Sequence, residues 1–457
     1  MNRRNWFKHI GAVTVAGSVG GLLSPRDVHA IENNVKRASE PSKLEITDLR
    51  VVRMGATWRK YVIRIDTNQG ISGYGEVRDG ASPTYALILK SRILGENPCN
   101  VDKIFRKLKQ FGGQARQAGG VVAIEMACWD LAGKAWGVPC WQMLGGKFRD
   151  KIRMYADTPT TKDPVEMGNR LKRRIEEHGF TFLKMDIGIG LLRGVEGALS
   201  YPEGMTETNL IMHPFTGIRI TDKGLKIFQD YAETVRDIVG WKTPIALDHF
   251  GHFPVEDCIK IAQALDPYNF AWYEDMIPWQ LTDQYVKLRE SCNTPILTGE
   301  DIYLKEGFMD LFEKKAIAIC HPDPASAGGL LETKKIGDLA MEHGIAMALH
   351  MAGSPITLFA SVHAAAATEN FMVCEHHNVD DEWYDKLVEG VEKPLLNDGY
   401  VTVPDGPGLG IELNEEEVKR HLREGEEYFA PTDEWNDERS WDRLWSRRTT
   451  KTQVMVS

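Results

Sequence analysis

The sequence predicts an α/β protein in which an N-terminal α+β domain precedes a barrel of the (β/α)8 type. From about Lys43 to Gly80 the pattern is strand-like, and from about Thr84 to Gly145 it is helical, which indicates a separate domain. After Lys151, short apolar strands that end in a polar residue alternate with helical stretches. This alternation implies a parallel sheet with right-handed crossovers, and eight such units favour closure into a barrel.

The eight predicted barrel strands share an apolar run with a polar end. In chain order they end in IRMYAD, FLKMD, IALDHF, AWYED, ILTGED, IAICHPD, AMALH and MVCEH. Helical stretches such as EDCIKIAQAL and GLLETKKIGDLAMEHG separate them. We therefore expect an α+β domain at residues 44–148 and a (β/α)7β barrel at 149–385. Residues 386–457 carry turn signals and then a charged, Trp-containing stretch, and we expect this C-terminal segment to return to the first domain.

Composition excludes several classes of protein. The 457 residues carry a formal net charge of −10 without a basic run, so nucleic acid is not an expected partner. The seven cysteines are scattered and form no CxxC motif, which argues against a disulfide framework and against a thiolate metal site.

Residues 1–30 have the pattern of a twin-arginine export signal. Arg3 and Arg4 precede an apolar stretch that begins near Ile10, and a small-residue end at Ala30 follows. The alternative is an uncleaved membrane anchor, but the apolar stretch is short and rich in glycine, so we expect no stable membrane insertion. We expect cleavage after Ala30 and a periplasmic location.

Polar residues at the strand ends form a regular series. From Asp248 onward the steps between them are 26, 26, 23, 27 and 25 residues, one strand-plus-helix unit each time. Catalytic groups of a (β/α)8 barrel lie at the C-terminal ends of its strands, so this spacing predicts one shared mouth. The series is Lys184, Asp248, Glu274, Glu300, Asp323, His350 and Glu375.

Three carboxylates of this series, Asp248, Glu274 and Glu300, end consecutive strands. Any one alone could equally cap the following helix, but three in register form an oxygen-only cluster that repels itself without a cation. Such a cluster suits Mg²⁺ with open positions for substrate, and we expect one ion per subunit.

The next two strands predict a general base. A carboxylate beside a histidine fixes its tautomer and raises its basicity, as expected for Asp323 beside His350. Glu375, on the last strand, could donate a hydrogen bond if the crowd of carboxylates raises its pKa.

Several motifs resemble the enolase superfamily, in its mandelate racemase and acid-sugar dehydratase branch. AIEMACWDLAGKAWGVPCWQMLGG resembles the capping-domain signature, and LDH, YED, TGED, HPDPASAGG and LHMAGSPITLFASVHAAAA resemble the barrel motifs in order. The resemblance covers about residues 44–425. It implies an α+β capping domain on a modified TIM barrel and a homo-oligomer. It also implies Mg²⁺ that binds the substrate carboxylate, α-proton removal by His350 with Asp323, and an enediolate that Glu375 steadies.

One departure from the family pattern bears on the reaction. Racemizing members carry Lys-x-Lys on the second barrel strand, whereas FLKMDIG places Lys184 first and Asp186 second, both pointing the same way. An aspartate paired with Lys184 is ionised and a poor base. The site is therefore expected to eliminate the β-hydroxyl of a sugar acid and give a 2-keto-3-deoxy acid.

Other interpretations remain open at this point. Asp186 could merely orient Lys184 or bind a substrate hydroxyl while another group serves the second face. The chain could also be a cycloisomerase or an epimerase/racemase on a related hydroxy acid. From another class, it could be a catalytically silent periplasmic carbohydrate-binding protein, although such a relative would be expected to have lost metal ligands or the histidine–aspartate pair.

Two histidines in DHFGHF, His249 and His252, are further substrate-binding candidates. Some sugar-acid dehydratases place an acid histidine two residues after the first metal ligand, but here the intervals from Asp248 are one and four. We expect His252 to reach substrate from a loop, and His249 to point away if the strand stays regular. The 61 residues between Asp186 and Asp248 predict a lid or a subunit contact.

Overall fold

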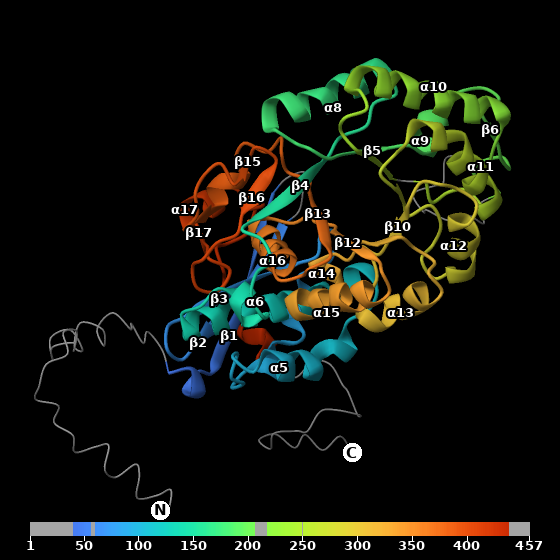
Figure 1. Ribbon diagram of the computed structural model, residues 1–457. Helices are drawn as coiled ribbons and strands as arrows, with labels where there is room; N and C mark the ends of the chain where they lie inside the picture. Colours follow the sequence, from blue (N-terminus) through green and yellow to red (C-terminus); the bar gives the residue numbers. More distant parts are fainter. Residues whose placement is uncertain (1–39, 56–59, 206–216, 249, 438–457) are drawn as a thin grey trace, which may run out of the picture. The chain divides into compact units, whose positions relative to one another are not determined.

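The computed structural model describes residues 40–55, 60–205, 217–248 and 250–437 (Figure 1). The predicted export signal and His249 lie outside these ranges. Among the helices in the described part of the chain, none combines the length and the apolar character that a membrane crossing requires.

An antiparallel sheet and one long helix build the capping domain. The sheet runs in the order β1 (Ile46–Met54), β2 (Lys60–Thr67) and β3 (Ser72–Val77), and α6 (Gly119–Trp136) packs on it. A Cβ atom at Gly75 would lie 1.9 Å from the carbonyl oxygen of Ala123, so glycine is what lets the helix lie this close to β3. The shorter helices are α3 (Thr84–Leu87), α4 (Lys90–Ile93), α5 (Val101–Leu108) and α7 (Cys140–Met143).

Eight parallel strands in the described residues close the barrel, because the last pairs with the first. Each contains or adjoins one of the eight predicted strand ends, so the predicted fold is confirmed. In sheet order the strands are β4 (Lys151–Asp157), β5 (Leu183–Asp186), β8 (Ile245–Asp248), β9 (Tyr273–Glu274), β10 (Ile296–Thr298), β11 (Ile319–Cys320), β12 (Ala346–Leu349) and β13 (Phe371–His376). A buried cluster that includes Tyr155, Trp272, Leu297 and Val373 fills the interior.

Helices connect the strands and surround them (Figure 1). Their ends follow local capping rules: Asp163 accepts a hydrogen bond from the backbone N–H of Val165, Pro164 opens α8, and Gly179 ends it at φ 70°. The connecting helices are α8 (Pro164–His178), α10 (Asp222–Val239), α11 (Val255–Leu265), α12 (Thr282–Arg289), α13 (Lys305–Glu313), α15 (Gly329–Glu342) and α16 (Pro355–Ala366).

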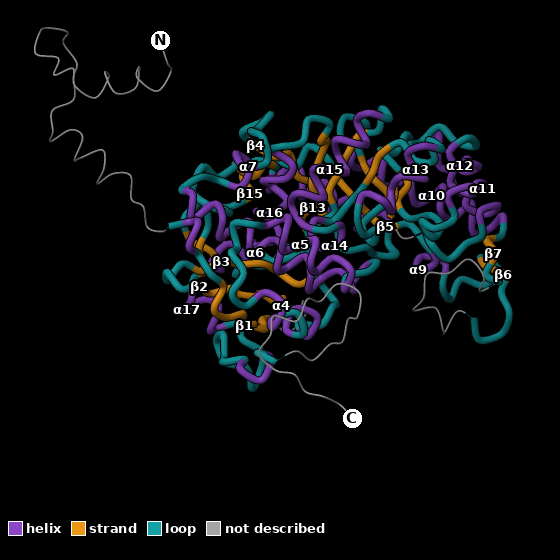
Figure 2. Tube along the Cα trace, turned by 90° about the horizontal axis from the view of Figure 1, so that it is seen from below, coloured by secondary structure: helices purple, strands orange, loops and turns teal. Residues whose placement is uncertain are grey.

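The long connection between β5 and β8 carries extra structure. It holds α9 (Ile189–Leu192) and a small hairpin of β6 (Leu199–Ser200) and β7 (Arg219–Ile220). Figure 2 shows this hairpin at the end of the barrel domain far from the capping sheet. A bidentate ion pair from Arg219 to Asp257, at 2.7 and 2.9 Å, ties the hairpin to α11.

The C-terminal segment contacts both parts of the molecule. Within it, β16 (Tyr400–Thr402) adds antiparallel to β4, while Leu422 bridges to Met54 of β1. Its other elements are β14 (Val388–Glu389), β15 (Leu396–Asn397), β17 (Glu412–Leu413) and α17 (Glu415–Arg420), coloured orange to red in Figure 1.

Charged side chains of the capping sheet reach the barrel loops. The carboxylate of Glu76 accepts hydrogen bonds from the backbone N–H of Ser354 and from the hydroxyl of Thr357, at the start of α16. The ammonium of Lys60 donates to the carbonyl of Ala352. These contacts fix the loop after β12, and with it the catalytic candidate His350.

Candidate active site

Lys184 lies at the centre of a buried charge cluster. Its side chain is 2% exposed, and its Nζ lies 2.9 Å from Oδ2 of Asp248, 3.6 Å from Oε2 of Glu274 and 2.5 Å from Oε1 of Glu375. Burial lowers the pKa of this ammonium, but the three carboxylates outweigh burial and raise the pKa well above its ordinary value. Lys184 is therefore a fixed positive charge in the mouth of the barrel.

An acidic group in the same mouth could hold a metal ion. One carboxylate oxygen each from Glu274, Asp275 and Glu300 gather within 4.8 Å of one another. Burial, followed by Glu300, Glu274 and Asp248, raises the pKa of Asp275 well above its ordinary value. This mutual repulsion is the condition that a bound cation relieves.

Two of the three predicted metal ligands belong to this acidic group. Glu274 and Glu300 lie together, whereas the Oδ2 atom of Asp248, on β8, accepts a hydrogen bond from Lys184. Asp275 joins the group because its backbone leaves the strand at φ 45°, so its side chain no longer alternates with that of Glu274. The hydroxyl of Thr298 donates to its Oδ1 at 2.5 Å.

Asp323 and His350 form the predicted pair. Asp323 caps the short helix α14 (Pro324–Ala327) through Oδ1, and its Oδ2 accepts a hydrogen bond of 2.6 Å from Nδ1 of His350. The other ring nitrogen, Nε2, lies 3.2 Å from Oε2 of Glu300. Burial lowers the pKa of His350, but Glu300, Glu375 and Asp323 together raise it to about 10.

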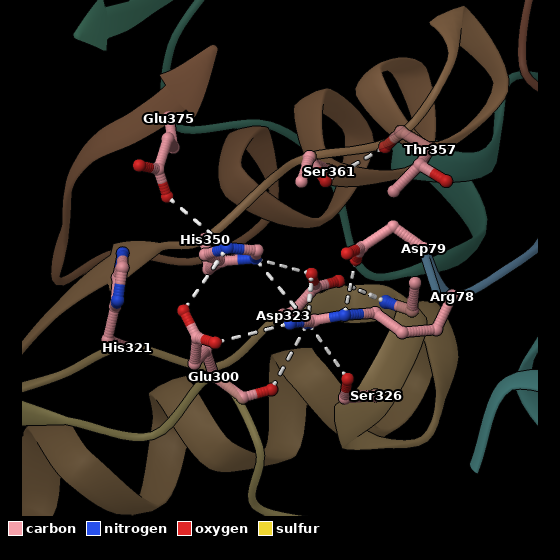
Figure 3. Close-up of polar contacts among 12 residues, drawn as sticks. Arg78, Asp79, Glu300, His321, Asp323, Ser326, His350, Thr357, Ser361 and Glu375 are labelled. Atoms are coloured by element: carbon pink, nitrogen blue, oxygen red, sulfur yellow. Dashed lines mark hydrogen bonds and ion pairs between the residues drawn. The ribbon is translucent and has the colours of Figure 1, made fainter. Parts of the chain in front are cut away.

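Arg78 of the capping domain completes this arrangement (Figure 3). Its guanidinium pairs with Asp323, lies 3.3 Å from Oε1 of Glu300 and donates to the hydroxyl of Ser326 at 2.9 Å. Its side chain is 1% exposed, and its Nε lies 2.6 Å from Oδ1 of Asp79. A residue outside the barrel therefore binds both Asp323, the partner of His350, and Glu300 of the acidic group.

Glu375 differs from its prediction. Burial raises the pKa of its carboxyl, but Lys184, followed by His377 and His350, holds the pKa well below the ordinary value. An ionised carboxylate accepts hydrogen bonds and does not donate them. The expectation that crowding raises the pKa of Glu375 is wrong, because its nearest neighbours are cations.

Two further histidines contact the cluster. Nδ1 of His321 lies 2.9 Å from Oε1 of Glu274, and the hydroxyl oxygen of Tyr155 lies 2.9 Å from its Nε2. His377 lies between Oε1 of Glu375 and Oδ2 of Asp157. His321 immediately follows β11 and His377 immediately follows β13, but the sequence pattern predicts Asp323 and Glu375 as the functional residues of those strands.

Asp186 and His252 line one pocket of about 430 Å³ beside the N-terminus of α9. Asp186 is the register partner of Asp248 in the β5–β8 pair, and its backbone N–H donates to the hydroxyl of Thr160. The structure therefore brings Asp186, a catalytic candidate, and His252, a predicted substrate-binding residue, together in one pocket. His249 lies outside the described residues.

Comparison with known proteins decides the family. The family model described as enolase C-terminal domain-like matches residues 166–418, and that of the mandelate racemase / muconate lactonizing enzyme N-terminal domain matches residues 33–145. The chain belongs to the enolase superfamily. The matches place it in the mandelate racemase/muconate lactonizing enzyme branch, as the motifs predict.

Enolase-superfamily relatives match over most of the chain. D-xylonate dehydratase of Haloferax volcanii is 32% identical over 394 residues, which cover 84% of this chain and 90% of that protein. D-galactonate dehydratase of Variovorax paradoxus is 25% identical over 400 residues, covering 85% and 97%. Among solved structures, the mandelate racemase/muconate lactonizing enzyme-like protein from Rubrobacter xylanophilus is 29% identical, with a TM-score of 0.75 over 85% of this chain and 100% of that one.

Proposed function

We propose that this protein is a Mg²⁺-dependent sugar-acid dehydratase. It removes the proton α to the substrate carboxylate, eliminates the β-hydroxyl and releases a 2-keto-3-deoxy acid. The observation that carries the proposal is the placement of Nε2 of His350, with Asp323 behind it, 3.2 Å from Glu300 of the acidic group. The names of the D-xylonate and D-galactonate dehydratases support a hydro-lyase.

The residues fit a magnesium ion. The donors Glu274, Asp275 and Glu300 are all oxygen ligands, which Mg²⁺ prefers, and their crowding favours a cation. Glu274 and Glu300 would hold it, with Asp248 and Asp275 as the neighbouring carboxylates. When bound, Mg²⁺ supplies positive charge that attracts the substrate carboxylate, offsets the charge of Glu300 and stabilises the negative charge that develops as the α-proton leaves.

The chain's own residues divide the remaining work. The Asp323 carboxylate fixes the Nδ1–H tautomer of His350. Glu300 is the largest cause that raises the pKa of His350, so once the charge of Glu300 is offset the ring is neutral and Nε2 is the atom that accepts the α-proton. Arg78 keeps Asp323 ionised, because it opposes the effect of burial on the pKa of that carboxyl. Lys184 offers its positive charge to the substrate carboxylate from a position between Asp248 and Glu375.

The residue at the second Lys-x-Lys position supports elimination over racemization. Asp186 stands where racemizing members carry a lysine base and lines the pocket that also contains His252, and we assign it no role as a second base for the α-carbon. We assign Asp186 and His252 to the substrate hydroxyls beyond C3, at the end remote from the carboxylate. We also propose that the enzyme acts in the periplasm after twin-arginine export, on the evidence of Arg3 and Arg4.

A screen of acid sugars tests the function. The mature protein would be incubated with Mg²⁺ and aldonates that include D-xylonate and D-galactonate, and 2-keto-3-deoxy acids would be assayed. We expect product with at least one acid, none with EDTA and none with His350→Asn. Isomerised acid without keto acid would instead support the epimerase interpretation, and an absence of both would contradict an enzymatic function.

A further inference from the structure

His377 occupies a bridging position at the seam where the barrel closes. The β13–β4 register pairs His376 with Ala156, so the next residues, His377 and Asp157, face each other across the strands. Nδ1 of His377 lies 3.4 Å from Oδ2 of Asp157, and Nε2 lies 3.3 Å from Oε1 of Glu375. Both ring nitrogens therefore face a carboxylate oxygen, which is the environment of a doubly protonated imidazolium.

Glu375 links this histidine to the predicted base. Its second oxygen, Oε2, lies 3.7 Å from Nε2 of His350, and the ring centroids of His350 and His377 are 5.5 Å apart. One atom each of His350, Glu375 and His377 fall within 4.8 Å of one another. Asp157, His377, Glu375 and His350 thus lie in series at the ends of β4, β13 and β12, each within 3.3–3.7 Å of the next.

The charges around His377 favour a stored proton. Burial lowers the pKa of His377, but Glu375 and Asp157 outweigh burial and the repulsion of His350, and the pKa is raised. Nζ of Lys184 lies 2.5 Å from the same oxygen of Glu375, Oε1, that faces His377, and it keeps that carboxylate ionised. These charges favour a proton on His377 and a negative charge on Glu375. The side chain of His377 is 20% exposed, so the proton can be renewed from solvent.

We propose that His377, held by Asp157, is a proton-relay residue that protonates the departing β-hydroxyl through Glu375. The inference rests on the proposed dehydratase function and adds an acid separate from the base. As His350 removes the α-proton, the electrons of that C–H bond form the C2=C3 bond and the C3–O bond breaks with its electron pair on oxygen. The ionised Glu375 accepts a proton from Nε2 of His377 and passes a proton to that oxygen, so water leaves, Glu375 is ionised again and His377 becomes neutral.

The same chain can restore the site. His350 holds the α-proton after elimination, and Glu375 lies between it and His377, so a proton can return along the path by which one was supplied. The site thus uses the last barrel strand for its acid, whereas racemizing relatives use the second strand for their second base. This division explains how dehydration proceeds although Asp186 stands where a second lysine would be.

The test compares the rates at which His377→Gln and Asp157→Asn eliminate two different leaving groups, water and fluoride. Each variant is the full mature enzyme, assayed with Mg²⁺. D-xylonate and its 3-deoxy-3-fluoro analogue serve as substrates, because fluoride departs as an anion without needing a proton. We expect kcat for water elimination to fall about 100-fold or more in His377→Gln. Fluoride release and solvent deuterium exchange at the α-carbon should stay within about threefold of wild type. Asp157→Asn should show the same pattern with a smaller loss.

The control is His421→Gln, which breaks a histidine–carboxylate contact of 3.1 Å with Glu417 of α17 in the C-terminal segment and should leave all three rates unchanged. Fluoride release that falls as far as water elimination would overturn the relay and leave His377 as a structural support of Glu375. Unchanged water elimination in His377→Gln would also overturn it. If the wild-type enzyme releases neither water nor fluoride and exchanges no α-proton, the proposed function fails, and the inference fails with it.

Discussion

Replacement of Arg78 by methionine would test how far the capping domain controls the catalytic dyad. The substitution keeps an unbranched apolar side chain and removes the guanidinium that pairs with Asp323. Both side chains are 1% exposed, and loss of one partner of a buried pair costs about 3–5 kcal/mol, because the other charge stays buried and unpaired. The pairs with Asp79 and Glu300 are more exposed and add at most about 1 kcal/mol each.

The same substitution should slow the reaction. Burial raises the pKa of Asp323, and Arg78 provides the largest opposing effect, so without Arg78 the carboxylate holds His350 less firmly. Removal of a partner that orients a functional group costs about 10–100-fold in activity. We therefore expect Arg78→Met to lower the free energy of unfolding by about 3–5 kcal/mol and kcat by about 10–100-fold.

The assay is urea unfolding followed by tryptophan fluorescence, together with kcat on the best substrate of the acid-sugar screen. Arg153→Met, which removes hydrogen bonds to Thr181 at the outside of the barrel, is the matched control and should change stability by less than about 1 kcal/mol. The stability and kcat of Arg78→Lys should lie between those of wild type and Arg78→Met, because lysine keeps the positive charge but cannot form the paired hydrogen bonds of a guanidinium. An Arg78→Met enzyme as stable and as active as the control would refute the reasoning.

Three further predictions follow from the buried charges. Lys184→Met should lower kcat by about 100-fold or more because it leaves Asp248 and Glu375 without their cation, and kcat near wild type in a folded variant would contradict this role. Burial raises the pKa of Glu125 to about 8, so the stability that its protonated carboxyl contributes should be lost as pH rises from about 4.5 through 8. In urea unfolding, Glu125→Gln should flatten this decline in the free energy of unfolding. The same pH dependence in wild type and variant would contradict the prediction. Mg²⁺ should raise the melting temperature over EDTA-treated protein, and Glu300→Gln should remove most of that shift, whereas an equal shift in both proteins would place the ion elsewhere.

Much of the fold and part of the site follow from local sequence pattern. Each barrel strand is a short apolar run with a polar end, and closure of the barrel brings all eight C-terminal ends around one mouth. The sequence alone therefore predicts that Lys184, Glu300 and His350 lie at this mouth. The side chain of Asp323 caps a helix as well as binding His350, which shows that the capping and catalytic interpretations of one carboxylate can both hold.

The remaining features depend on contacts that no periodicity encodes. Arg78 comes from another domain, and its place beside Asp323 depends on how the two domains pack. Asp275 enters the acidic group through a left-handed backbone conformation that a regular strand does not predict. The ionised state of Glu375 depends on Lys184 and His377, and His377 meets Asp157 only through the register that closes the barrel.

The most direct test of the central claim is the fate of hydrogen at C2 and C3 when the mature enzyme converts D-xylonate in D₂O with Mg²⁺, followed by NMR. We expect a 2-keto-3-deoxy product with one solvent deuteron at C3 from the wild-type enzyme, and no product or α-exchange with His350→Asn. Keto acid formed at the wild-type rate by His350→Asn, or deuterium gained at C2 by the wild-type enzyme without any elimination, would contradict it.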